Sequence, residues 1–240
     1  MKKIIELYQS KYKFNSFYEK ASFKILQNNN VNQNFDMGFI TSENPEFNYK
    51  AKYPDSRVDL PIWFGNPDSA IIKIMFLGRE PSDSADKNNI EKSEEMNYVF
   101  GTPFGIEFWN EKNKYFKAFK EIVSNKNVLS YFSDVVKIFE VSESKNKSKA
   151  KAKVNFWKNA DGDTKNIEFL MSEVEMLNPD VIIGLGNDSY NFLNKHFSKT
   201  RKIEKVKHPA ARKDEKTNEN AWDVASRELI AIQNKYLLNK

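Results

Sequence analysis

A short apolar run that is cut off by a glycine most constrains what this chain can fold into. Residues 71–77, Ile-Ile-Lys-Ile-Met-Phe-Leu, have the length and composition of a buried strand, and Gly78 ends the run abruptly. Residues 180–186, Asp-Val-Ile-Ile-Gly-Leu-Gly, form a second run of this kind. The two runs predict core strands, the first opening into a loop and the second into a helix.

Segments with helical periodicity alternate with these strands. We expect helices over residues 108–123, 167–177, 188–196 and 219–238, and further strands over residues 130–141 and in a short segment that ends at Lys207. Strands that alternate with helices are typical of α/β domains. The chain is therefore predicted to adopt a three-layer α/β/α fold with a mostly parallel four-stranded central sheet.

The whole chain, residues 1–240, is predicted to form one domain, because its length suits a single α/β core and no break in composition divides it. Residues 1–56 are rich in aromatic residues at mixed helical spacing and then in asparagine, and are expected to form a helical N-terminal extension. Residues 59–67 are predicted to be a turn-rich approach to the first core strand.

The composition excludes several classes of protein. No apolar run approaches the ~18 residues of a membrane span and the N-terminus lacks the apolar core of a secretory signal, so we expect a cytoplasmic protein with no membrane partner. Cysteine is absent, which excludes disulfides, thiolate nucleophiles and cysteine-ligated clusters. With only two histidines as well, we expect no metal and no cofactor, while the sequence leaves an oxygen-ligated Mg²⁺ site open.

The charge pattern favours a polyanionic partner at one place in the chain. The net charge of +5, from 38 basic and 33 acidic residues, is a mild excess that decides little by itself. Around His208, however, the basic residues gather: Lys205, Lys207, Arg212 and Lys213. This region is therefore a candidate for contact with nucleic acid.

Three loops are predicted to build an active site. They are residues 78–82, Gly-Arg-Glu-Pro-Ser; residues 101–105, Gly-Thr-Pro-Phe-Gly; and residues 208–210, His-Pro-Ala. Open α/β sheets bind ligands beyond the carboxyl ends of their strands, where such loops lie. The glycine pair of residues 184–186 lacks the third glycine of a dinucleotide fingerprint, and we interpret it as a tight turn.

From about Leu60 to the C-terminal helix the chain resembles the uracil-DNA glycosylase superfamily. Members have a strand ending in a Gly-x-x-Pro loop, then a Gly-x-x-Phe loop, a central strand with a base-reading residue, and a late His-Pro-Ser-like loop. The corresponding segments here are residues 78–82, 101–104, 133–137 and 208–212. The resemblance implies the same fold, without the iron–sulfur cluster of some branches, since cysteine is absent.

By this resemblance, Glu80 and His208 are the candidate catalytic residues. Glu80 stands where relatives orient the attacking water and stabilise the sugar cation, and His208 would donate a hydrogen bond to the departing base. The competing interpretations are a helix-capping role for Glu80 and a structural role for His208. Phe104 would stack on the extruded base, with Phe108 as its competitor.

The resemblance also implies a base-binding set and a DNA-binding set. The base-binding candidates are Gly78, Arg79, Pro81, Ser82, Phe104 and Asp134; the DNA-binding candidates are Pro209, Ala210, Arg212 and Lys213. Arg212 would enter the gap left by the flipped base or clamp a phosphate. The implied partner is double- or single-stranded DNA, bound by a monomer.

Asp134 departs from the family pattern. Many relatives place an asparagine there, which can pair with uracil, whereas an ionised aspartate only accepts hydrogen bonds and suits the amine of cytosine. Ser82 replaces a tyrosine that excludes C5-substituted bases in some relatives. The alternative is a one-position misalignment, with Asp134 a strand-end cap.

The sequence therefore predicts a monofunctional DNA glycosylase that hydrolyses the bond between a flipped pyrimidine and its sugar and leaves an abasic site. A C5-modified cytosine of phage DNA is the favoured base, with antiviral defence as the role. The alternatives are a uracil-DNA glycosylase of base excision repair, a non-catalytic DNA-binding relative, and a nucleotide or small-molecule hydrolase.

Overall fold

The computed structural model describes residues 1–12, 15–21, 37–43, 56–58, 61–80, 114–140, 157–213 and 218–240. The strands in these ranges are β1 (Asn15–Ala21), β2 (Met37–Glu43), β3 (Ser56–Val58), β4 (Ile62–Phe64), β5 (Ile72–Gly78), β6 (Val128–Asp134), β7 (Ile138–Glu140), β8 (Val181–Leu185) and β9 (Ile203–Val206). The helices are α1 (Lys2–Tyr12), α3 (Lys114–Val123), α4 (Trp157–Ala160), α5 (Thr164–Leu177), α6 (Asn187–Phe197) and α7 (Ala221–Leu237). None of these helices is long and apolar enough to cross a membrane.

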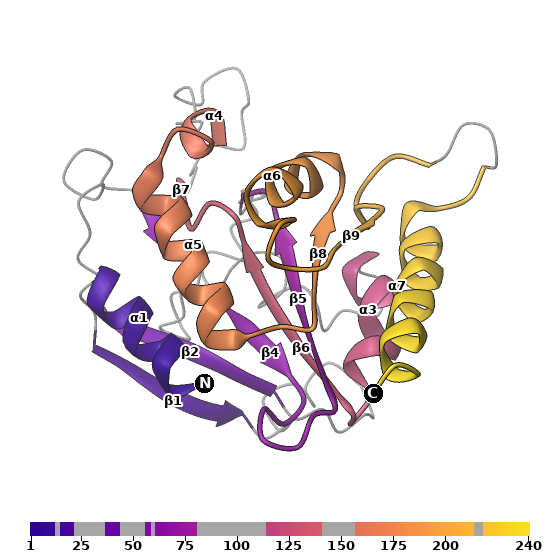
Figure 1. Cartoon of the computed structure of the whole chain (residues 1–240), viewed down its shortest axis with the longest axis horizontal. Helices are drawn as coiled ribbons and strands as arrows, with labels where there is room; N and C mark the ends of the chain where they lie inside the picture. Colours follow the sequence, from indigo (N-terminus) through magenta and orange to yellow (C-terminus); the bar gives the residue numbers. More distant parts are fainter. Residues whose placement is uncertain are drawn as a thin grey trace.

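A seven-stranded sheet runs through the molecule in the order β1-β2-β4-β6-β5-β8-β9 (Figure 1). The four strands β6, β5, β8 and β9 pair in parallel, which confirms the predicted parallel core of the sheet. β4, β2 and β1 extend it through antiparallel pairs on the β6 side. β3 and β7 form a separate antiparallel pair.

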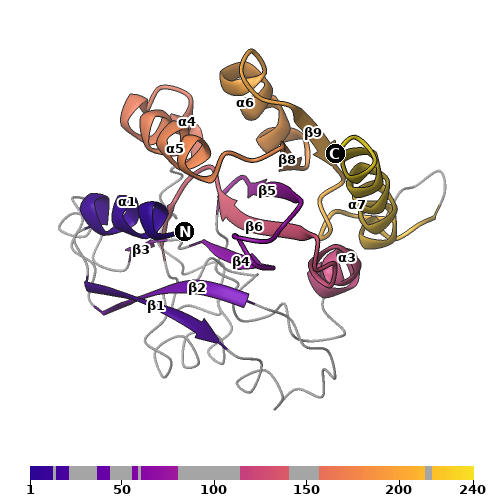
Figure 2. The same ribbon diagram turned by 60° about the horizontal axis from the view of Figure 1, so that its bottom comes forward.

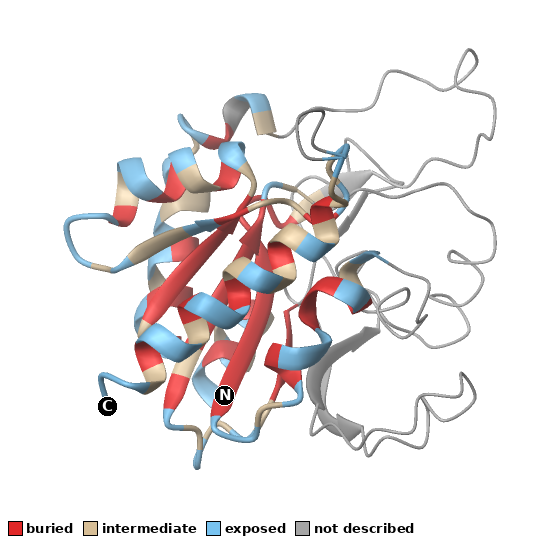
Figure 3. Cartoon of the chain, turned by 90° about the vertical axis from the view of Figure 1, so that its right-hand side faces the viewer, coloured by how far each residue is buried: buried red, intermediate tan, exposed pale blue. Residues whose placement is uncertain are grey.

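Helices cover both faces of the parallel strands, so the predicted three layers are confirmed (Figure 2). α3 and α7 pack on one face, and α1, α5 and α6 pack on the other. In β5, Ile74 and Phe76 belong to the core beneath α3 and α7, whereas Met75 and Leu77 belong to the core beneath α1, α5 and α6. This alternation is the two-residue period of a strand. Figure 3 shows the resulting buried strands between the half-exposed helices.

The structure corrects three expectations about secondary structure. Residues 15–21 and 37–43 are paired strands, so the expected helical extension over residues 1–56 is helical in α1 and not in β1 or β2. Aromatic residues favour pleated strands over helices, and the pairing of β1 with β2 stabilises the extended conformation here. Residues 62–64 form β4 instead of turns, and the strand expected over residues 130–141 is divided into β6 and β7.

The glycine pair at the end of β8 forms the tight turn that we expected. Gly186 has φ +87°, a conformation that glycine adopts without strain, and α6 begins at the next residue. A Cβ on Gly184 would lie 2.6 Å from the backbone of Tyr190, so the glycine lets α6 pack directly on β8. The turn therefore fixes how α6 leaves the carboxyl edge of the sheet.

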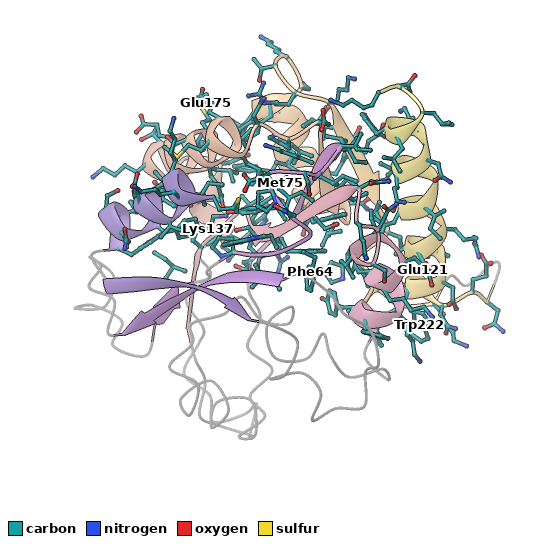
Figure 4. All side chains as sticks on the ribbon, turned by 90° about the horizontal axis from the view of Figure 1, so that it is seen from below. Phe64, Met75, Glu121, Lys137, Glu175 and Trp222 are labelled. Atoms are coloured by element: carbon teal, nitrogen blue, oxygen red, sulfur yellow. The ribbon has the colours of Figure 1, made fainter. Side chains whose placement is uncertain are left out.

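A fully buried ion pair joins the turn after β6 to α5. Lys137 Nζ lies 2.8 Å from Glu173 Oε2, neither side chain is exposed, and Lys137 Nζ also donates to Ser133 Oγ at 2.6 Å. The hydroxyls of Tyr8 and Tyr131 both donate to Glu173 Oε1. Figure 4 shows Lys137 in the interior of the molecule, where the pair binds α1, α5 and β6 to one another.

We expect Lys137→Met to lower the free energy of unfolding by about 3–5 kcal/mol, because it leaves the Glu173 carboxylate buried without its cation. Lys137→Met with Glu173→Gln should recover most of this loss, since the amide still accepts from the tyrosines and carries no charge. Urea denaturation measures both. Lys165→Met, at an exposed position of α5, is the control, and a loss below about 1 kcal/mol in Lys137→Met would contradict the argument.

Candidate active site

Gly78 and Asp134 meet at the carboxyl edge of the sheet. They are paired Cα partners at the ends of the parallel strands β5 and β6. A Cβ on Gly78 would lie 1.9 Å from Asp134 Oδ1, so only glycine leaves room for this carboxylate. Asp134 is 6% exposed, and the next two backbone N–H groups, of Val135 and Val136, donate to the carbonyls of Gly78 and Arg79. These two hydrogen bonds hold the segment after β6 beside the segment after β5.

Arg79 links the first loop to α6. Its guanidinium donates to Glu80 Oε1 at 2.8 Å and to Asp188 Oδ2 at 3.1 Å, and it lies 5.9 Å above the ring of Trp157. Asp188 is in the first turn of α6 and Trp157 begins α4. The Glu80 side chain is one-fifth exposed, so its carboxylate is positioned by Arg79 and still in reach of water.

His208 follows β9 and is held in one tautomer. The backbone N–H of Ala210 donates to Nδ1 at 3.2 Å, so in the neutral ring the proton is on Nε2. Nε2 lies 3.4 Å from the hydroxyl of Tyr115, whose ring meets the imidazole edge to face. A Cβ on Gly186 would lie 3.3 Å from His208 Cβ, so the turn after β8 also packs against this residue.

The surroundings of His208 favour its neutral form. Burial of the imidazole lowers its pKa below the ordinary value of 6.5, and the positive charge of Arg79 lowers that pKa further. At neutral pH the ring is therefore uncharged and presents Nε2–H as a hydrogen-bond donor. Such a donor can stabilise negative charge that develops on a ligand oxygen.

These contacts bring most of the described candidates together. Gly78, Arg79, Glu80 and Asp134 are joined by the Arg79–Glu80 ion pair and by the paired ends of β5 and β6, and His208 is close enough to Arg79 for the guanidinium to lower the imidazole pKa. Pro81, Ser82, Phe104 and the rest of the loop over residues 101–105 lie outside the described residues. The site therefore offers a carboxylate, a neutral N–H donor and a buried aspartate along one edge of the sheet.

The DNA-binding candidates lie on the loop after β9. Pro209 is buried, whereas Ala210, Arg212 and Lys213 are exposed. Of these four, the three exposed residues are the ones that can contact a ligand from the loop. Their part in DNA binding stays a prediction.

Three residues at this edge were missed in the sequence. Asp188 could have been found, because it lies two residues after the glycine turn of a parallel strand, where ligand-binding residues gather. Tyr115 and Trp157 gave no such signal, since both are in or next to segments in which aromatic residues are common. Only the tertiary contacts with His208 and Arg79 distinguish them.

Comparison with known proteins identifies the family. A model of the uracil DNA glycosylase superfamily matches residues 64–229, which is more than half of the chain and includes Glu80, Asp134 and His208. The chain belongs to this superfamily, as the resemblance of its loops implied. The family is one of DNA glycosylases, hydrolases that act on DNA. A search of curated proteins finds no match.

We expect Arg79→Met to raise the pKa of His208, because the substitution removes a nearby cation, but not as far as 6.5, because burial is the larger cause. NMR titration of the two imidazoles measures this, with Arg227→Met on α7 as the control. The unfolded chain protonates His208 at higher pH than the folded chain, so this residue makes stability fall as pH drops below about 6.5. If His208 of the wild-type protein titrated with a midpoint above pH 6.5, burial and Arg79 would not be lowering its pKa.

Proposed function

We propose that the protein is a monofunctional DNA glycosylase that cleaves the bond between a flipped pyrimidine and its sugar. One observation carries the proposal: Arg79 holds the Glu80 carboxylate at the same edge of the sheet where His208 presents a neutral Nε2–H. Glycosidic cleavage develops positive charge on the sugar and negative charge on the leaving base. A carboxylate and a neutral hydrogen-bond donor suit these two charges respectively.

In the proposed reaction the C1′–N1 bond breaks and its electron pair stays with the base. Nε2–H of His208 donates to the O2 atom on which this charge accumulates. The water oriented by Glu80 then bonds through its oxygen to C1′, and one of its protons passes to the carboxylate. Glu80 returns that proton to the base anion, so the products are an abasic site and a neutral base.

The proposed substrate is a cytosine with a substituent at C5. Asp134 is nearly fully buried, and an ionised carboxylate there can accept from the N4 amine of cytosine but would face the O4 oxygen of uracil. A substrate binds poorly when it places a second hydrogen-bond acceptor against a buried acceptor, because neither group then has a donor. Such a site discriminates strongly against that substrate. Ser82, which would leave room at C5, supports the same choice by its small size.

We propose antiviral defence as the role of this activity. Cytosines substituted at C5 mark the DNA of some phages, and an abasic site in that DNA would block its replication. Excision of uracil in base excision repair is the alternative that the family relationship supports.

We expect the wild-type protein to excise cytosines and Asp134→Asn to shift its preference towards uracil, because the amide can donate to O4. The assay uses duplexes and single strands containing uracil, cytosine, 5-hydroxymethylcytosine or glucosylated 5-hydroxymethylcytosine, followed by alkaline cleavage of abasic sites. Excision of uracil and none of the cytosines would refute the role of Asp134. Absence of strand breaks on all substrates would refute the enzymatic proposal.

Glu80→Gln should slow base excision by about 10²–10⁴-fold, because the amide keeps the shape of the side chain but neither accepts a proton nor opposes the sugar cation. Single-turnover kinetics on whichever oligonucleotide the wild type cleaves measure this, and duplex affinity should be unchanged. Glu175→Gln, at an exposed position of α5, is the matched control. A Glu80→Gln enzyme with the wild-type rate would remove Glu80 from the mechanism.

A further inference from the structure

The start of α3 lies beside the candidate active site. α3 ends at Val123, close before β6, whose first residue Val128 pairs with Ile72 at the amino edge of the sheet. Its other end is therefore at the carboxyl edge, and the contact between Tyr115 and His208 places it there directly. The residues around Tyr115 on α3 consequently border the site.

Two exposed lysines next to Tyr115 share one aromatic ring. Lys114 Nζ lies 5.8 Å and Lys117 Nζ lies 5.2 Å from the ring centre of Trp222, which is in the first turn of α7. α3 and α7 run side by side (Figure 2), and Figure 4 shows Trp222 on the side of the molecule that these helices form. The ring attracts both ammonium groups and holds them at one place on the surface.

The acidic residues near Trp222 are engaged elsewhere. Glu219 pairs with Arg227 at 2.9 Å, and Asp223 accepts from Asn220 at 2.9 Å. Glu228 accepts from the backbone N–H of Lys207 at 2.7 Å.

The two lysines, in contrast, have no ion pair within the described part of the chain. No carboxylate among the described residues neutralises their charges.

We propose that Lys114, Lys117 and Trp222 form a phosphate-binding surface that holds the DNA backbone next to His208. The choice of DNA as the anion rests on the proposed function. Arg212 and Lys213, which are exposed on the loop that follows His208, add further positive charge next to this residue, so a strand whose base enters the site would meet several cations there. A fixed pair of lysines contacts phosphates without reading sequence, and so adds affinity and orientation.

A matched pair of lysines exists at the opposite edge of the sheet. Lys202 Nζ lies 5.3 Å from the ring centre of Tyr236, near the C-terminal end of α7, and precedes β9 at its amino end. Lys199 is close to it in sequence, and both are exposed. Removing the charges of Lys199 and Lys202 lowers the net charge of the protein by the same amount as removing those of Lys114 and Lys117. Because the control charges lie at the opposite edge of the sheet from His208, they test whether position matters.

The test measures binding of a fluorescein-labelled 20-base-pair duplex without modified bases over a series of salt concentrations. Each phosphate contact contributes about −0.9 to the slope of log affinity against log salt. Lys114→Gln with Lys117→Gln should therefore make the slope shallower by about 2 and weaken binding about tenfold near physiological salt. The control variant, Lys199→Gln with Lys202→Gln, should change both the salt slope and the affinity much less. Thermal melting checks that both variants fold.

The outcomes separate this proposal from the proposed function. An unchanged salt slope in the Lys114/Lys117 variant, an equal change in the control variant, or no binding of duplex by the wild type would each overturn the phosphate-binding surface. If the wild type excises no base but the Lys114/Lys117 variant alone loses affinity, the glycosylase proposal fails and the surface stands. If excision occurs and the slopes do not differ, the glycosylase stands and the surface fails.

Discussion

The buried Lys137–Glu173 ion pair is the interaction on which the arrangement of the site most depends. Two charges removed from water cost several kcal/mol each, and their attraction offsets this only when other polar groups complete their hydrogen bonds. Ser133, Tyr8 and Tyr131 supply those bonds here. Because burial, and then the charge of Glu173, raise the pKa of Tyr8 well above its ordinary value, its hydroxyl stays protonated and donates.

This network acts on the site through the alternation of strand β6. The Ser133 side chain accepts from Lys137, on the face of the sheet covered by α1 and α5, and the next residue, Asp134, meets Gly78 at the strand end. Successive side chains of a strand point to opposite faces, so fixing Ser133 also fixes the direction of Asp134. The helix α1, far away in sequence, thus contributes through Tyr8 to the geometry of a base-reading candidate.

Of the parallel strands, β5 and β8 were the easiest to predict, because each is a largely apolar run followed by a glycine turn or a loop. β1, β2 and β4 could not be predicted, since each is a strand only by pairing with a partner, as Trp63 of β4 does with Tyr131 of β6. The sequence pattern of one segment does not show which other segment will pair with it as a neighbouring strand. The loop motifs indicated the family, which the comparison confirms. The contact of Arg79 with Asp188 could not be foreseen because it joins residues 109 positions apart, and burial of a lysine at position 137 contradicts the usual preference of this residue.

In the proposed reaction, Arg79 would reconcile the opposite demands of glycosidic cleavage. Its one positive charge lies between two carboxylates, those of Glu80 and Asp188, so the three groups together keep one negative charge. That negative charge is the sign that the proposed sugar cation would require. The guanidinium opposes protonation of His208 and so keeps the imidazole neutral, as the proposed hydrogen bond from Nε2–H to the base would need. Since nearly half of the Arg79 side chain is exposed, water screens these effects in the free protein, and a DNA strand that excluded this water would strengthen them.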